Sequence, residues 1–100
     1  MYYAAPKNSR PAFAIFTETV CDGQVPAWRD KNGLPVSYPT EREAQIEIAE
    51  TLIEHLHQFI AGEREFADAL ISGDFILPVH VLPDGTIQTE DGRRFGAQET

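Results

Sequence analysis

The chain has 100 residues, of which 42% are hydrophobic and 10% aromatic, and its net charge is −8. This length and composition predict one folded domain with a single core and exclude an intrinsically disordered chain. The negative charge disfavours direct binding to nucleic-acid phosphates. The lone cysteine excludes an internal disulfide, and no stretch approaches the roughly 20 apolar residues of a membrane span or a signal-peptide core. We therefore expect a cytoplasmic protein.

The first third of the chain predicts a loose arm followed by extended segments. Residues 1–11 show no period and are expected to form the arm. Ala12–Val20 alternates in a way that is typical of a strand with an apolar residue on each face. Val25–Arg29 and Leu34–Tyr38 are short extended pieces whose prolines favour a sheet edge. The turn between them places Gly33 in a left-handed conformation.

The stretch from about residue 40 to 61 predicts one long amphipathic helix. Thr40 is the expected N-cap, Glu43 completes a capping box, and Gly62 is the expected left-handed stop. Eight apolar residues share an arc of roughly 160° at 100° per residue, and we expect this arc to bury against a sheet. They are Ile46, Ile48, Ala49, Leu52, Ile53, Leu56, Phe59 and Ile60.

The last third predicts a short helix over about 63–71 and then a hairpin. Phe75–Leu82 alternates as a strand, and we assign the face with Phe75, Leu77, Val79 and Val81 to the helix side. Pro78 favours an edge or a bulge. Residues 83–86 form a turn, Ile87–Thr89 the return strand, and Arg93–Phe95 a last short strand.

Strands on both sides of a helical block favour an α+β fold with two layers. We predict an antiparallel sheet of three to five strands with both helices on one face. The domain spans residues 12–95, and residues 96–100 form a frayed tail. The other face of the sheet carries Ile76, Pro78 and Leu82 beside Phe13 and Ile15 or Phe16, and such a patch favours a subunit interface. Monomer and homodimer remain equally open.

The leading functional hypothesis depends on a row of acids on the long helix, namely Glu43, Glu47, Glu50 and Glu54. Their spacing places like charges side by side without a lysine or arginine among them, which destabilises a helix slightly. Such a row favours a docking face for a basic protein partner. The chain is then a small non-enzymatic protein-interaction module. A minor alternative is a nucleic-acid mimic, in which the carboxylates imitate phosphates.

A second hypothesis, of a different class, is a small enzyme or small-molecule binder with a pocket at the end of the sheet. It requires that Cys21, Trp28 and His80 converge, with His80 or His55 as base for the thiol. The sequence contains no phosphate-binding loop, nucleophile elbow or zinc motif. Glu54 and His57 share a helical face, but two or three surface ligands do not make a metal site. We therefore expect no metal and no cofactor.

Overall fold

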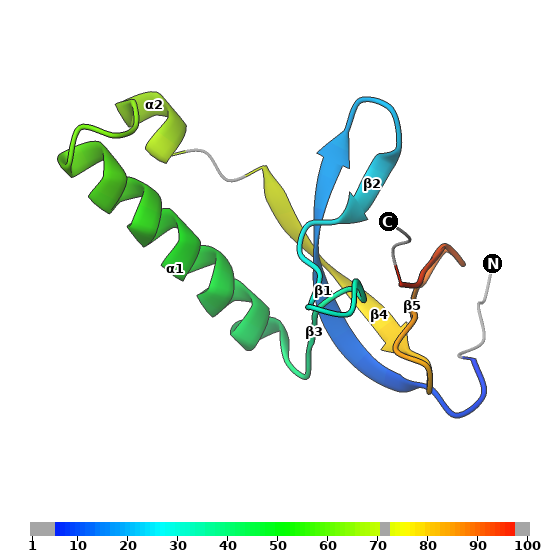
Figure 1. Cartoon of the computed structure of the whole chain (residues 1–100). Coiled ribbons are helices and arrows are strands. Elements are labelled where there is room, and N and C mark those ends of the chain that lie inside the picture. The colour runs from blue at the N-terminus through cyan, green and yellow to red at the C-terminus, as the bar shows by residue number, and fades with distance from the viewer. Residues whose placement is uncertain (1–5, 71–72, 98–100) are drawn as a thin grey trace.

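The computed structural model describes residues 6–70 and 73–97 and has an α+β fold (Figure 1). The helices are α1 (Glu41–Ile60) and α2 (Phe66–Ala69). The strands are β1 (Arg10–Thr19), β2 (Gly23–Pro26), β3 (Ser37–Tyr38), β4 (Asp74–Val81), β5 (Ile87–Thr89) and β6 (Arg94–Phe95). The predicted fold class and the antiparallel sheet are confirmed.

The sheet contains more strands than the three to five predicted. Its strand order is β2-β1-β4-β5-β6, and β3 pairs with β1 beside β2, which makes six strands in a nearly barrel-shaped sheet. The longest pairing joins β1 to β4, from Arg10 opposite Val81 to Thr17 opposite Asp74. β3 and β6 contain two residues each. A strand of two residues has no alternation to detect, so the number of strands could not be read from periodicity.

Side chains link the two ends of this strand order. The Nη2 atom of Arg93 donates to Oε1 of Gln24 at 3.1 Å, which connects the β5–β6 turn to β2. Arg29, just after β2, donates through Nη1 to the carbonyl oxygens of Gly33 and Gly96, each at 2.7 Å. These contacts hold the curled sheet together where no strand ladder closes it.

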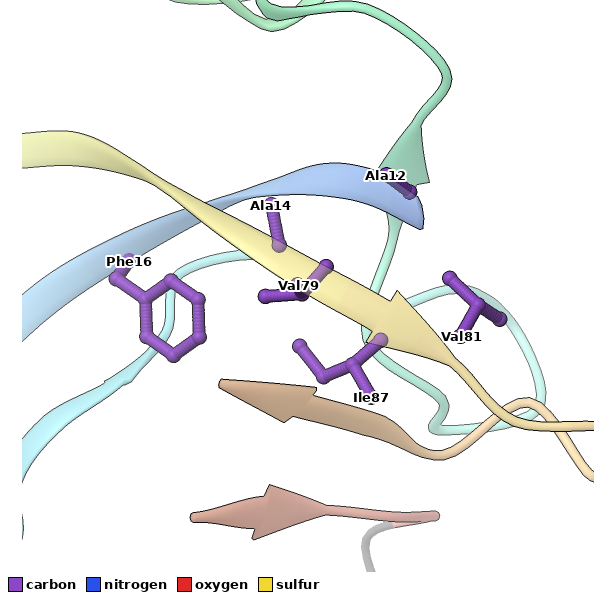
Figure 2. Close-up of a cluster of buried hydrophobic side chains, with 6 residues drawn as sticks. All are labelled: Ala12, Ala14, Phe16, Val79, Val81 and Ile87. Atoms are coloured by element: carbon purple, nitrogen blue, oxygen red, sulfur yellow. The ribbon is translucent and has the colours of Figure 1, made fainter. Parts of the chain in front are cut away.

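The core lies inside the curl and comes from the strands. It comprises Ala12, Ala14 and Phe16 of β1, Val79 and Val81 of β4, and Ile87 of β5, with Phe75, Leu77 and Phe95 packed against them. Figure 2 shows Phe16, Ala14, Val79 and Ile87 gathered between the β1–β4 ribbon and β5. The ring of Phe16 lies 5.5 Å from that of Phe95, edge to face. The assignment of Phe75, Leu77, Val79 and Val81 to the helix side was wrong, because β5 and β6 cover that face.

The long helix packs against the outer face of the β1–β4 ribbon (Figure 1). Tyr38 pairs with Phe13, and directly opposed residues share a face, so Tyr38 lies on the outer side. Glu47 of α1 is near enough to perturb the Tyr38 phenol. The face expected to be an open patch is therefore partly covered, and Ile15 on it is buried.

The rotation of α1 about its own axis differs from the expectation. Ala44 is the fully buried residue of the helix, and His55 and Thr51 on the same side are half-buried. Ile46, Ile53 and Ile60 are 42%, 52% and 77% exposed. At 100° per residue, the buried side is turned roughly 100° from the centre of the predicted apolar arc. Half of that arc therefore faces solvent.

The predicted ends of α1 are confirmed. The Thr40 hydroxyl accepts from the Glu43 backbone N–H at 3.2 Å, which is the cap expected from the sequence. At the other end, Gly62 has φ of 83°, and the Glu63 N–H donates to the Gln58 carbonyl at 2.8 Å. This is the glycine-terminated bonding pattern that satisfies the last carbonyls of a helix.

The short helix is shorter than the predicted 63–71. α2 has four residues, and its Phe66 ring lies 5.1 Å from that of Phe59 at the end of α1. The Nε of Arg64 donates to Oε1 of Gln58 at 2.7 Å, which fixes the connection between the helices. Residue 71 of the predicted helix, residues 1–5 of the predicted arm and residues 98–100 of the predicted tail lie outside the described residues, and β1 begins within the predicted arm, at Arg10.

The expectation of a sheet edge at Pro78 is confirmed in part. β4 is a central strand, but β5 pairs only with Val79, His80 and Val81. On the β5 side, Pro78 lies just past the end of that ladder. Proline has no backbone N–H to donate. It is tolerated at position 78 because β5 does not extend far enough to pair with this residue.

We expect Phe16→Ala to lower the free energy of unfolding by about 3–5 kcal/mol, because it removes a fully buried ring that contacts Phe75 and Phe95. Urea unfolding followed by circular dichroism measures this loss. Val20→Ala, at a side chain that is fully exposed, is the control and should change stability by less than about 0.5 kcal/mol. A loss below about 1.5 kcal/mol for Phe16→Ala would contradict the central place of this ring.

Candidate functional site on the long helix

The surface of α1 divides into three arcs when its residues are placed at 100° intervals. One arc faces the outer side of the sheet and includes Ala44, Thr51 and His55. A second arc carries the exposed isoleucines. The third carries the acidic row, which lies between the isoleucines and the sheet-facing arc and meets the sheet at Glu47. The helix therefore presents two different surfaces to its surroundings.

The acidic row is exposed over most of its length. Glu43, Glu50 and Glu54 are exposed, and Glu47 is half-buried. Among the residues that the structure describes, none of these four carboxylates forms an ion pair or accepts a side-chain hydrogen bond. An ion pair between Arg93 and Asp91, at 3.0 Å, lies at the β5–β6 turn and not on α1. The mutual repulsion along the row is thus not relieved from within the described chain.

Glu47 marks the edge where the acidic row meets the sheet. Burial raises the pKa of Tyr38, and the Glu47 carboxylate raises this pKa further, because both disfavour the phenolate. Tyr38 belongs to β3, so this interaction joins the helix to the strand that leads into it. Glu47 therefore has a structural neighbour, whereas Glu43, Glu50 and Glu54 point to solvent.

The exposed isoleucines are a feature that the sequence reasoning missed. Ile46, Ile53 and Ile60 follow one another at intervals of seven residues, and Ala49 and Leu56 lie between them. This is an a/d pattern, which brings a narrow apolar stripe to one side of a helix. The stripe was hidden inside the wider apolar arc. The seven-residue spacing was the signal that separates it from the residues facing the sheet, such as Ile48 and Leu52.

The structure does not bring Cys21, Trp28 and His80 together. Cys21 is exposed beyond the β1–β2 pairing, which ends at Thr19 opposite Gly23. His80 pairs with Pro11 at the opposite end of β1, roughly 25 Å away along the strand. Trp28 is half-buried beside the middle of β1, where the Ala27 N–H donates to the Ile15 carbonyl at 2.9 Å.

Three depressions in the described surface are lined by residues other than Cys21, Trp28 and His80. Two of them, of about 310 and 380 Å³, share Arg10, Val81 and Gly85 at the end of the curl. Their charged residues, Arg10 and Asp30, are exposed. Asp30 accepts from the backbone N–H groups of Asn32 and Leu34, so its carboxylate stabilises a turn. An exposed cation and a turn-forming carboxylate do not form a catalytic pair.

A third depression, of about 220 Å³, lies beside the β5–β6 turn and includes Thr89, Asp91 and Arg93. Hydrogen bonds from the Thr89 hydroxyl and from Arg93 lower the pKa of Asp91. The Arg93 Nε donates to both Asp91 oxygens at 3.0 Å, and its Nη2 reaches Gln24. These bonds fix the turn that closes the curled sheet, so their role is structural.

Within residues 6–70 and 73–97, no cluster of three or more histidine, cysteine, aspartate or glutamate side chains is arranged to hold a metal ion. Of the helices described, none is long and apolar enough to cross a membrane. No protein-family model, no curated protein and no solved structure matches the chain. The exposed surfaces of α1 are therefore the candidate functional sites of the described chain.

We expect Glu47→Gln to lower the pKa of Tyr38 while leaving it above the usual value, because burial is the larger cause of the shift. The chemical shift of a Tyr38 ring carbon, followed by NMR as the pH is changed, measures the pKa of the phenol. Because the raised pKa favours the neutral phenol in the folded state, its contribution to stability is present below about pH 10 and is lost as the pH rises beyond it.

Glu50→Gln is the matched control, since Glu50 is exposed and does not contribute to the Tyr38 shift. An equal fall of the Tyr38 pKa in both variants would show a general effect of helix charge. It would contradict the specific placement of Glu47 beside β3.

Proposed function

We propose that this protein is a non-enzymatic protein-interaction module whose acidic row, Glu43, Glu47, Glu50 and Glu54, binds a basic surface of another protein. The observation that carries the proposal is the exposed and unpaired state of the row on a helix that the core hardly uses. Like charges at helix-neighbour positions repel, and a cationic partner relieves that repulsion on binding.

The position of the row in the fold supports this proposal. The core is built from β1, β4, β5 and β6, so substitutions on the outer arcs of α1 leave it intact. A surface that is decoupled from the core is available for recognition without loss of stability. The negative charge of the whole chain adds long-range attraction for a cationic partner, which raises the association rate at low salt.

The alternative of a small enzyme or small-molecule binder lacks a supporting observation. It requires Cys21, Trp28 and His80 in one pocket, and they are distributed along the length of β1. The nucleic-acid mimic is a special case of the leading proposal. In that case the basic partner is a DNA-binding protein, and duplex DNA competes for the same surface.

We expect the double variant Glu47→Lys, Glu50→Lys to lose its partner. The native chain and the variant serve as baits in a lysate of the source organism, and mass spectrometry identifies the captured proteins. Affinity for the purified partner should fall at least about tenfold at low salt, because two attractive contacts become repulsive. Addition of duplex DNA to the native capture distinguishes the mimic from an ordinary protein ligand.

The control is Glu18→Lys, Glu90→Lys, which makes the same change in net charge at exposed positions away from α1. The control should retain the partner and show the same helical circular dichroism as the native chain. Equal capture by the native chain and both variants would show that the acidic row is a solvent-exposed surface that does not bind the partner. Equal loss in both variants would attribute binding to net charge and not to this face.

A further inference from the structure

The exposed apolar stripe of α1 is separate from the acidic row and needs its own explanation. It consists of four exposed residues, Ile46, Ala49, Ile53 and Ile60, and the half-buried Leu56, and we call it the isoleucine seam. At 100° per residue these five residues lie within an arc of roughly 80°. Soluble monomers bury most residues of this type or scatter them singly. A contiguous exposed seam therefore indicates a surface that is covered in the assembled protein.

The spacing of the seam identifies the kind of surface that covers it. Residues 46, 53 and 60 occupy position a of a heptad, and residues 49 and 56 occupy position d. In a parallel coiled coil, isoleucine at a with leucine at d favours two helices over three or four. Ala49 lacks bulk at the first d position, which lets the second helix approach closely there.

The exposed apolar area of the two helices is somewhat less than one side of a standard dimer interface. Ile46, Ile53 and Ile60 are exposed along the seam, and Phe59, Phe66 and Leu70 are exposed at the C-terminal end of α1 and in the α2 segment. From their exposed fractions and typical side-chain areas, these six side chains present on the order of 600 Å². Each partner of a standard interface buries roughly 800 Å².

The charges beside the seam are compatible with a parallel arrangement of the two helices. Position e is occupied by Glu43, Glu50 and His57, and position g by Gln45, Leu52 and Phe59. In a parallel pair, e faces g of the other helix, so no carboxylate opposes a carboxylate.

We infer that the isoleucine seam binds the same seam of a second copy of this chain, forming a parallel two-helix contact with two-fold symmetry. This interface differs from the outer sheet face, which α1 already covers in part. It also leaves the outer side of the acidic row, at Glu47 and Glu54, away from the contact. The inference does not depend on the proposed basic partner.

Sedimentation equilibrium of the full chain over a range of concentrations tests self-association. The native mass should rise from 11.2 kDa toward twice that value as concentration increases. Ile53→Glu should remain at the monomer mass and weaken dimerisation at least about 100-fold, because it places two charges in the apolar contact. Glu54→Gln, at the adjacent exposed position outside the seam, should dimerise like the native chain.

Ile53→Ser is a second disrupting variant that introduces no charge, and circular dichroism should show native helix content for each variant. A native chain that stays at the monomer mass at every concentration overturns the inference. So does a dimer that survives Ile53→Glu, or one that weakens when salt is raised. An apolar contact between two chains of charge −8 should tighten with salt.

Cross-linking tests the orientation in a Cys21→Ser background, which removes the exposed native thiol. With a short bis-maleimide, Ile46→Cys should cross-link to Ile46→Cys, and Ile60→Cys to Ile60→Cys. Efficient linkage only in the mixture of the two variants would show antiparallel helices and overturn the parallel contact. The double variant Glu47→Lys, Glu50→Lys should still dimerise, so failure of the partner proposal and failure of this one are distinguishable.

Discussion

The pairing of β1 with β4 is the constraint on which the rest of this fold depends. It joins segments separated by the two helices and aligns eight residue pairs, from Arg10 with Val81 to Thr17 with Asp74. Once this register is set, Ala12, Ala14 and Phe16 share a face with Leu77 and Val79, and that face must be covered. The small side chains of Ala12 and Ala14 leave room for Ile87 and the ring of Phe95. The strands β5 and β6 then curl over this face, and the inside of the sheet is complete without a helix.

The position of α1 follows from that completed core. Only the outer face of the ribbon remains for the helix. This face offers fewer apolar side chains, because Pro78 and His80 lie on it. The helix is held at its start, where Ala44 is buried and Tyr38 lies near Glu47. Its apolar residues exceed what this contact can bury. The surplus is the isoleucine seam, and the acidic row lies between the seam and the sheet-facing side of the helix. The three arcs occur on one helix. They differ because the sheet covers only one side of that helix, and not because the helix is divided into segments of different composition.

The sequence predicted the features that depend on local chemistry. The Thr40 cap, the left-handed Gly33 and Gly62, and the β4–β5 hairpin were all correct, because each depends on a few neighbouring residues. The predicted covering of the β4 face and the predicted rotation of α1 were wrong, because alternation shows that two faces differ without showing which element covers each.

For the candidate site, the four acids could be found from spacing alone. The exposure of Ile46, Ile53 and Ile60 could not, because an apolar arc of roughly 160° looks the same whether a sheet covers all of it or half.

The stability of α1 connects its two exposed arcs. A helix of 20 residues is marginal by itself in water, and most helices are stabilised by packing one face against a core. Here that packing is limited to the sheet-facing arc, while the repulsion in the acidic row acts against the helix. In the proposed dimer a second helix on the isoleucine seam would supply the missing burial, and in the proposed complex a cationic surface on the acids would remove the repulsion. The two contacts occupy different arcs of one helix, and each stabilises the helical state that the other recognises. Binding at one arc is then coupled to binding at the other through the order of α1, even though no residue needs to contact both partners.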